Sequence, residues 1–350
     1  MCIRDRLHNI YKAISVTLVL VGLTYSGVVV AHEGAEDALP DGSDGILFIA
    51  MGPSNNFAMI DLATEKVMKA VAGQLNPHGL AVTPDGKTVY LTSRNPDPNQ
   101  ETGTGKSFPV VAIDTQTGEI KAKIDVGGES HHAWMNPDGE QVYVTVPKNE
   151  GIVAIDTKTN TVLKKIETGF KANSSATSPD GTQIYVLNKG DDSLSVIDRA
   201  TLTVQKTVTV GKGPDHLAVS PIGDFIYFTA AYGNEVWALN AKTMEPSAQV
   251  QVDKGPHGIA VSADGKQVYV ANRGEGSFTV FAGGDLEKIY STKLGTGPGH
   301  VAVAPDRANV YINDEAEFKT YIFDPKKREV IHTIHLWPEP HETAFYIPKG

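Results

Sequence analysis

Residues 257–272 read HGIAVSADGKQVYVAN, and this stretch decides the fold of the chain. Small apolar residues alternate through HGIAVSA, DGK forms a tight turn in which glycine supplies a positive φ, and QVYVAN alternates again. GSFTVFA (276–282) and KIYSTKL (288–294) have the pattern of two further strands. We therefore predict four short strands within about 40 residues.

The same turn recurs along the chain. Copies of PDG and its variants follow one another at intervals of 42 residues, beginning at Pro137, Pro179, Pro221, Ala263 and Pro305. An earlier copy begins at Pro84, and the longer gap after it contains the polar stretch NPDPNQETGTGKS (95–107), which we expect to be a loop. Four strands in units of this length are typical of propeller blades, and the absence of amphipathic helical stretches excludes parallel α/β folds.

The two ends of the repeat region complement each other. ILFIAMG (46–52), NFAMIDL (56–62) and KVMKAVA (66–72) supply a second, third and fourth strand, and HETAFYI (341–347) supplies a first strand. Together they make one complete blade and leave no open sheet edge. We predict an all-β fold, a seven-bladed β-propeller of four-stranded blades over residues 43–350, with one blade closed by both ends.

The N-terminal segment is expected to lie outside the propeller. Basic residues precede an apolar run, Ala13–Ala31, and the polar sequence HEGAED follows it. This is the pattern of a secretory signal peptide over residues 1–31, followed by a linker over residues 32–42. We expect cleavage after Ala31 and a periplasmic or secreted protein; an uncleaved membrane anchor is the alternative.

The composition argues against several classes of function. The chain has 41 acidic and 31 basic residues and a net charge of −10, which argues against nucleic acid as a partner. The one cysteine, Cys2, lies in the signal segment, so the exported protein would have no disulfide and no thiolate ligand. We expect no membrane association after signal cleavage, and a small-molecule ligand or a redox partner protein as the partner.

Seven of the eleven histidines share one position of the repeat. The heads of the first strands read PHGLAV, HHAWM, NSSAT, PDHLAV, PHGIAV, PGHVAV and PHETAF. Two adjacent columns of this alignment contain His78, His131, His132, His216, His257, His300 and His341. Random placement would put fewer than one histidine there. Because the first strand of a blade lines the central channel, we expect these imidazoles to converge at one mouth of it.

Converging imidazoles favour a metal site. Imidazolium charges would repel one another, whereas neutral imidazoles can share a metal ion. Such ligands suit copper, zinc, nickel or iron, and not magnesium or calcium. Because a zinc site uses three or four protein ligands, seven histidines favour a multinuclear copper site, two separate sites, or a haem-type macrocycle with histidine on both sides. A water-filled polar channel is the alternative.

Other residues are weaker candidates for the same mouth of the channel. Residues that follow second strands could reach a bound ligand or cofactor: Arg94, Lys148, Tyr232, Arg273, Asp314 and Glu315. Asp215 and Glu342 flank ring histidines and could orient them as hydrogen-bond acceptors. His32 could chelate a metal at the mature N-terminus. The sequence has no recognisable nucleophile–histidine–acid spacing, phosphate-binding glycine loop or CxxCH haem motif.

Two further groups are expected to have no part in the site. His332 and His335 belong to an outermost strand and should be structural or exposed. Five aspartates end third strands and should cap the turns that follow: Asp61, Asp114, Asp156, Asp198 and Asp324.

The repeats also resemble known families. YVTV (143–146), YVLN (185–188) and YVAN (269–272), with third strands such as AIDT (154–157) and VIDR (196–199), resemble the YVTN family of seven-bladed propellers. That resemblance implies the fold over about 43–350, but its members include enzymes, cofactor carriers and scaffolds. The histidine doublet with five single histidines is similar to the copper-cluster propeller domain of nitrous oxide reductase, without the second copper domain of that enzyme. This similarity implies a copper-binding ring more than nitrous oxide reduction.

The sequence therefore predicts an exported propeller whose axial histidine ring binds copper for redox chemistry on a small molecule. The metal would transfer electrons and act as a Lewis acid. Two alternatives stay open. A periplasmic metallochaperone would release its metal to a weak competitor, and a metal-free scaffold or binding propeller would contain no metal.

Overall fold

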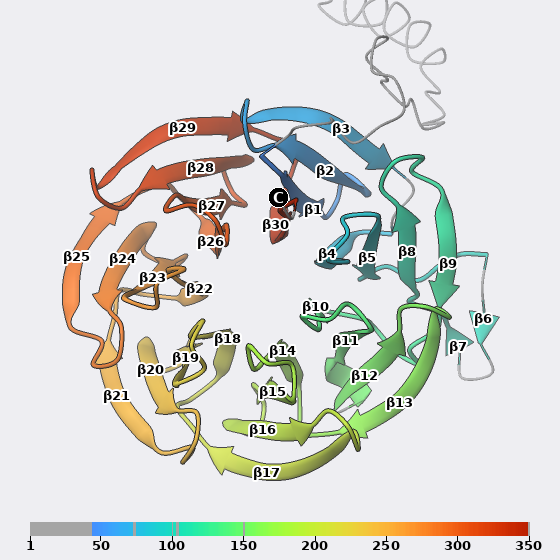
Figure 1. Cartoon of the computed structure of the whole chain (residues 1–350), viewed down its shortest axis with the longest axis horizontal. Coiled ribbons are helices and arrows are strands. Elements are labelled where there is room, and N and C mark those ends of the chain that lie inside the picture. Colours follow the sequence, from blue (N-terminus) through green and yellow to red (C-terminus); the bar gives the residue numbers. More distant parts are fainter. Residues whose placement is uncertain (1–43, 73–74, 100, 103–104, 150, 349–350) are drawn as a thin grey trace, which may run out of the picture. The chain divides into compact units, whose positions relative to one another are not determined.

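The structure is a computed structural model that describes residues 44–348 except 73–74, 100, 103–104 and 150. Seven four-stranded antiparallel sheets surround a central channel, which confirms the predicted seven-bladed propeller (Figure 1). The predicted signal segment and linker, with Cys2 and His32, lie outside the described residues. In the part of the chain that is described, no helix has the length and apolarity needed to cross a bilayer.

In six of the seven blades the two inner strands are joined by the PDG-type turn. Five of these turns contain a glycine with a positive φ, such as +74° at Gly265, and Arg307 occupies that position in the sixth. The innermost strands are β4 (Pro77–Val82), β10 (Ala133–Met135), β14 (Ala172–Thr177), β18 (Pro214–Val219), β22 (Pro256–Val261), β26 (Pro298–Val303) and β30 (Pro340–Tyr346). The second strands are β5 (Thr88–Ser93), β11 (Gln141–Val146), β15 (Gln183–Asn188), β19 (Phe225–Ala230), β23 (Gln267–Asn272), β27 (Val310–Asp314) and β1 (Ile46–Met51).

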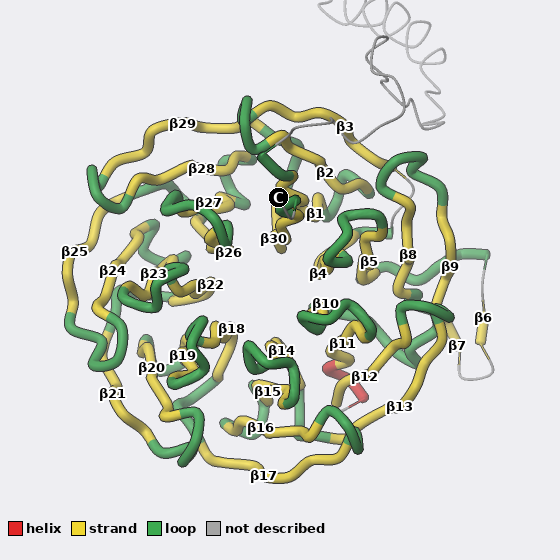
Figure 2. Tube along the Cα trace, in the orientation of Figure 1, coloured by secondary structure: helices red, strands yellow, loops and turns green. Residues whose placement is uncertain are grey.

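The outer half of each blade completes the sheet (Figure 2). The third strands are β8 (Val110–Asp114), β12 (Gly151–Asp156), β16 (Ser193–Asp198), β20 (Glu235–Asn240), β24 (Ser277–Ala282), β28 (Lys319–Asp324) and β2 (Asn56–Asp61). The fourth strands are β9 (Ile120–Ile124), β13 (Thr161–Glu167), β17 (Thr203–Thr209), β21 (Pro246–Gln251), β25 (Lys288–Lys293), β29 (Glu329–His335) and β3 (Lys66–Ala72). A short 3₁₀ turn, η1 (Pro147–Asn149), follows β11.

The hydrophobic core lies between neighbouring blades. Second strands such as β11 and third strands such as β12 are buried on both faces. Fourth strands such as β13 are mostly exposed to solvent. A tyrosine occupies the same buried position in six second strands: Tyr90, Tyr143, Tyr185, Tyr227, Tyr269 and Tyr311. Six of the seven blades therefore contribute a tyrosine ring at the same position to the close-packed core.

The seventh blade has the strand order β3-β2-β1-β30, which confirms closure by both ends of the repeat region. Ile46 pairs with Tyr346 and Phe48 pairs with Ala344 across the junction. The expected loop at 95–107 differs in one respect, because it contains a small separate hairpin, β6 (Glu101–Thr102) and β7 (Gly105–Lys106). The two strands have two residues each, too few for the alternation of apolar and polar residues that marks a strand in a sequence.

Candidate metal centre in the central channel

Every inner strand begins with an irregularity that turns two successive residues toward the channel. In β10, the N–H of His131 donates to the carbonyl of Thr145 (2.9 Å), and the N–H of Thr145 donates to the carbonyl of His132 (3.0 Å). Two residues thus oppose one, as in a β-bulge. The same register shift occurs at the heads of β4, β14, β18, β22, β26 and β30. A regular strand would point adjacent side chains to opposite faces, so the bulge explains how a doublet can serve one site.

The bulges create two stacked layers of side chains. The first position of each head, nearer the loops between blades, contains His78, His131, Asn173, Asp215, His257, Gly299 and His341. The second position contains Gly79, His132, Ser174, His216, Gly258, His300 and Glu342. Glycine at a second position is required by close packing, since a Cβ at Gly79 would lie 2.5 Å from the carbonyl oxygen of His131. The motif PHG therefore places an imidazole in one layer and keeps the other layer open at that blade.

Threonine hydroxyls fix the spacing between neighbouring heads. Thr92 Oγ1 accepts from the N–H of Gly79 (2.7 Å) and donates to the carbonyl of His131 in the next blade (2.6 Å). Thr145 and Thr229 bridge their neighbours in the same way. Each bridge is buried, so it stabilises a set distance between adjacent histidine-bearing backbones.

The seven imidazoles form one continuous cluster. Ring centroids are separated by 3.6 Å for His78 and His341, and by 3.9 Å for His300 and His341. The chain of contacts continues around the channel through His131, His132, His216 and His257, with neighbouring centroids 4.3 to 4.9 Å apart. The predicted convergence is therefore present in the structure. His332 and His335 lie on β29, the outermost strand of its blade, and stand apart from the ring, as expected.

Hydrogen-bond acceptors orient several of these rings through Nδ1. His257 Nδ1 lies 3.1 Å from Asp215 Oδ2, and His341 Nδ1 lies 3.1 Å from the carbonyl oxygen of His78. His132 Nδ1 lies 3.2 Å from Glu342 Oε1, but the pair does not have the geometry of a hydrogen bond. Because a carboxylate or carbonyl oxygen only accepts, the ring proton of His257 and of His341 belongs on Nδ1. The Nε2 atoms of these two rings face other groups, since His257 Nε2 lies 3.3 Å from Arg273 Nη1 and His341 Nε2 lies 3.1 Å from His300 Nε2. Metal-ligating histidines usually have such an outer acceptor; Asp215 takes the predicted role toward His257, whereas Glu342 lies beside His132 without a hydrogen bond to it.

Burial lowers the pKa of five of the seven ring histidines. The pKa values of five ring histidines lie well below the usual value near 6.5, first because burial disfavours the cation and then because neighbouring imidazoles repel it: His78, His131, His216, His300 and His341. Both ring nitrogens of His132 and both ring nitrogens of His216 are buried without a hydrogen-bond partner. Buried polar nitrogens without a partner are rare in folded proteins and indicate a missing ligand.

Comparison with known proteins identifies the family. Residues 64–329 match the family model of the lactonase, seven-bladed β-propeller. The chain belongs to that family. No curated protein matches the sequence.

Solved structures show the same fold as this lactonase-family propeller. A putative 6-phosphogluconolactonase from Bacteroides uniformis superposes with a TM-score of 0.73 at 19% identity, over 86% of this chain and 99% of that one. The periplasmic gluconolactonase of Pseudomonas aeruginosa gives 0.71 at 18% identity, over 87% and 99%. Kuenenia stuttgartiensis hydrazine synthase gives 0.66 at 21% identity, over 84% and 99%. These matches give no support to the resemblance to nitrous oxide reductase.

A charged cavity of about 310 Å³ opens above the first layer of the ring in this lactonase-family chain. Its walls include Arg94, Lys189, Arg273, Glu315 and Glu339 in addition to the histidines. Arg94 and Arg273 were predicted to reach a ligand, and the structure brings both to the cavity. Lys148 and Tyr232 were predicted too, but they are not among its lining residues; Lys148 pairs with Glu129 at 2.7 Å instead.

The repeat register explains both the misplaced and the overlooked residues. Arg94, Lys189, Arg273 and Glu315 each follow the buried tyrosine of the second strand by four residues. Lys148 and Tyr232 are five residues beyond theirs, so they point elsewhere. Counting from that tyrosine would have found Lys189, whose ammonium lies 2.9 Å from Asp215 Oδ1.

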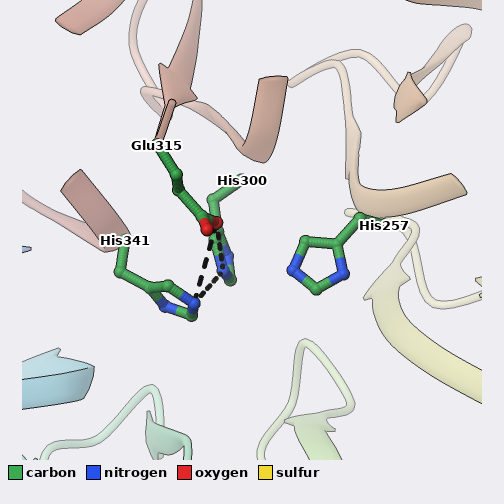
Figure 3. A group of neighbouring side chains, drawn as sticks. All are labelled: His257, His300, Glu315 and His341. Atoms are coloured by element: carbon green, nitrogen blue, oxygen red, sulfur yellow. Dashed lines mark hydrogen bonds and ion pairs between the residues drawn. The ribbon is translucent and has the colours of Figure 1, made fainter. Parts of the chain in front are cut away.

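Glu315 is a buried carboxylate beside the ring. Its Oε1 lies 3.8 Å from His341 Nε2 and 4.0 Å from His300 Nε2 (Figure 3). Its other oxygen pairs with Arg273. Burial raises the pKa of Glu315, although Arg273 opposes the shift. Asp314, in contrast, is fully buried and accepts from the backbone N–H groups of Ala316 and Glu317, so it caps a turn.

The aspartates that end third strands are structural, as predicted. Asp61 Oδ1 accepts from the N–H groups of Ala63 and Thr64, and Asp156 and Asp198 make the equivalent bonds in their blades. These bonds close the turns between the third and fourth strands, which are the outer strands of each blade.

Proposed function

We propose that the histidine ring binds one or more transition-metal ions, with copper as the first choice, and that the metal serves a reaction on a small molecule. The main support is the convergence of seven imidazoles, two of which, His132 and His216, have buried nitrogens that have no protein partner. An unpaired buried acceptor costs free energy in the absence of a ligand. A metal ion would satisfy these lone pairs and use the neutral state that burial maintains.

The side chains that could ligate a metal form three overlapping groups, and the possible ligand atoms of each group lie within 4.8 Å of one another. The groups are His257, His300, Glu315 and His341 (Figure 3); His78, His131 and His132; and Asp215, His216 and His257. One ion with tetrahedral or square coordination would use only one group, so the ring has enough donors for more than one ion. Imidazole-rich sets suit copper, and zinc or iron are the alternatives.

Metal analysis tests this proposal. The full chain, purified after export and dialysed, is expected to retain copper in at least equimolar amount when exposed to Cu²⁺, with a visible absorption band. The double variant His131→Ala/His132→Ala should lose most of that metal and remain folded. His332→Ala/His335→Ala, a matched change on the outermost strand, should bind like the wild type. Absence of bound metal, or equal binding by both double variants, would refute the proposal.

Lability separates an enzyme from a metallochaperone. A resident cofactor should stay on the protein when a weak chelator such as glycine is added in excess, because several oriented imidazoles bind together. Transfer of the metal to glycine within minutes would instead support the delivery role, and redox chemistry at this site would be rejected.

A second candidate function is hydrolysis of a lactone, favoured by the family to which the chain belongs. In this reaction water adds to the ring carbonyl, the C–O ester bond breaks, and the leaving oxygen takes a proton. Glu315, whose pKa burial raises, could supply that proton, and Arg273 beside it could bind an anionic product. A ring-bound metal would polarise the carbonyl.

Glucono-δ-lactone is a suitable first probe, with acid release followed by pH-stat. If the chain is a lactonase, Glu315→Gln should lower kcat at least about 100-fold. Glu317→Gln, on the neighbouring turn, is the matched control and should have little effect. Metal-free and copper-loaded samples measured side by side decide whether the metal takes part. A wild-type rate equal to the uncatalysed rate would reject this substrate.

A further inference from the structure

The central channel has a second cavity, of about 640 Å³, at the end opposite the charged one. All seven inner strands contribute to it, and in five blades the first residue of the PDG-type turn does so as well. We call this cavity the vestibule. Its volume falls in the range of small-molecule sites, about 300–1,000 Å³.

The wall of the vestibule is mainly apolar. Leu80, Trp134, Val219, Val261, Val303 and Phe345 represent it, and its described lining includes no lysine, arginine or aspartate. The hydroxyl groups come largely from one side, where the blade without histidines contributes Ser174, Thr177 and Ser178; Thr177 accepts from Trp134 Nε1 at 3.2 Å. An ion placed against this wall would lose its hydration without gaining a counter-charge.

The floor of the vestibule is the second layer of the ring. His216, His300 and Glu342 belong to both the ring and the vestibule lining. Both ring nitrogens of His216 lack a hydrogen-bond partner, so the floor offers a polar group that a ligand could contact. The two layers of the ring therefore face different environments, with the charged cavity on one side and the apolar vestibule on the other.

We propose that the vestibule binds a neutral, mostly apolar small molecule with one polar group directed at His216 and His300. The hollow, bounded by seven strands, suits a small molecule, and the apolar wall with a polar floor sets its orientation. This inference goes beyond the proposed function, because binding in the vestibule does not require a metal in the ring.

The dye Nile red, which is neutral and apolar, provides a test on the metal-free full chain. Its fluorescence should rise to saturation with one dye per protein. Val303→Glu in β26 adds a charge to the wall and should weaken binding at least tenfold, whereas Val330→Glu in β29 of the same blade should bind like the wild type. Ala302→Trp, which fills the vestibule without adding charge, should also weaken binding; circular dichroism verifies the fold of each variant.

Two results would overturn the inference: no saturable binding by the wild type, or equal affinity in wild type, Val303→Glu and Ala302→Trp when all are folded. Because the dye is measured without metal and copper content is measured without dye, a failure here is distinct from a failure of metal binding.

Discussion

The consecutive blades β10–β13 and β14–β17 share their framework. Tyr143 and Tyr185 are buried at the same position, and each hydroxyl donates to a glutamine two residues earlier, Gln141 or Gln183, at 2.8 Å. Both blades also begin with the same bulge and end their third strands with a turn-capping aspartate.

The two blades differ at the head of the inner strand. The first presents His131 and His132 to the channel, and the second presents Asn173 and Ser174. The blade without histidines nevertheless supports the ring, since Asn173 Nδ2 donates to Asp215 Oδ1 at 2.7 Å. Fold and site thus depend on different positions of one repeat, and each can be changed while the other is kept.

Removing a framework element should have the largest effect. Deletion of residues 338–350 removes β30, which exposes an edge of β1 and uncovers the core around Phe48. We expect no soluble folded protein, measured by expression yield and circular dichroism. Deletion of the separate hairpin 101–106 is the control and should leave the propeller folded. An unchanged melting temperature after the first deletion would contradict closure by both ends.

The buried tyrosines should matter equally in both blades. Tyr143→Ala and Tyr185→Ala each empty a packed position, and we expect the free energy of unfolding to fall by about 3–5 kcal/mol in each case. Ser174→Ala, at the head of the same blade as Tyr185, should change it by less than about 1 kcal/mol. Urea denaturation measures all three. A much smaller loss for one tyrosine than for the other would show that the blades are not equivalent in framework.

The pH dependence of stability should depend on the histidines at the heads of the inner strands. Ring histidines with lowered pKa stay neutral in the fold but take up a proton when unfolded, so stability is full above about pH 6.5 and is lost as the pH falls below that value. Each such group contributes up to about 1.4 kcal/mol per pH unit. Replacing His131-His132 by the Asn-Ser pair of the next blade should reduce the slope.

Urea denaturation of the metal-free protein at pH 7.5, 6.5 and 5.5 measures this slope. The variant His332→Asn/His335→Ser is the control and should keep the wild-type slope. Identical slopes for the wild type and the His131→Asn/His132→Ser variant would mean that the ring does not stay neutral.

The smallest effect should come from an orienting residue. Asp215→Asn removes the charge that fixes His257 without removing a ring nitrogen, and copper affinity should fall about tenfold. Competition with a chelator of known affinity measures the change, and Asp264→Asn in a surface turn is the control. Unaltered affinity would place His257 outside the metal site.

The framework was predictable because its signals repeat. The period and the alternating strands recur along the chain, and the turn glycine occurs in five blades, so errors at one copy are corrected by the others. The convergence of the seven histidines followed from the same register. The division of these side chains into two layers could not be predicted, because it depends on β-bulges that no residue type marks, apart from the glycine in PHG. The positions of Lys189 and Glu315 follow from the four-residue spacing after the buried tyrosine. Lys148 and Tyr232, which lie five residues after theirs, obscured that spacing in the sequence.

Closure by β30 also sets the order in which the site can be made. His341 lies on that strand, so it leaves the ribosome after the six other ring histidines. Until it pairs with β1, the channel has a gap on one side and the ring has no fixed diameter. Biosynthesis therefore completes the scaffold and the imidazole cluster in a single final event, and a metal ion that needs the whole ring has to arrive after translation of β30.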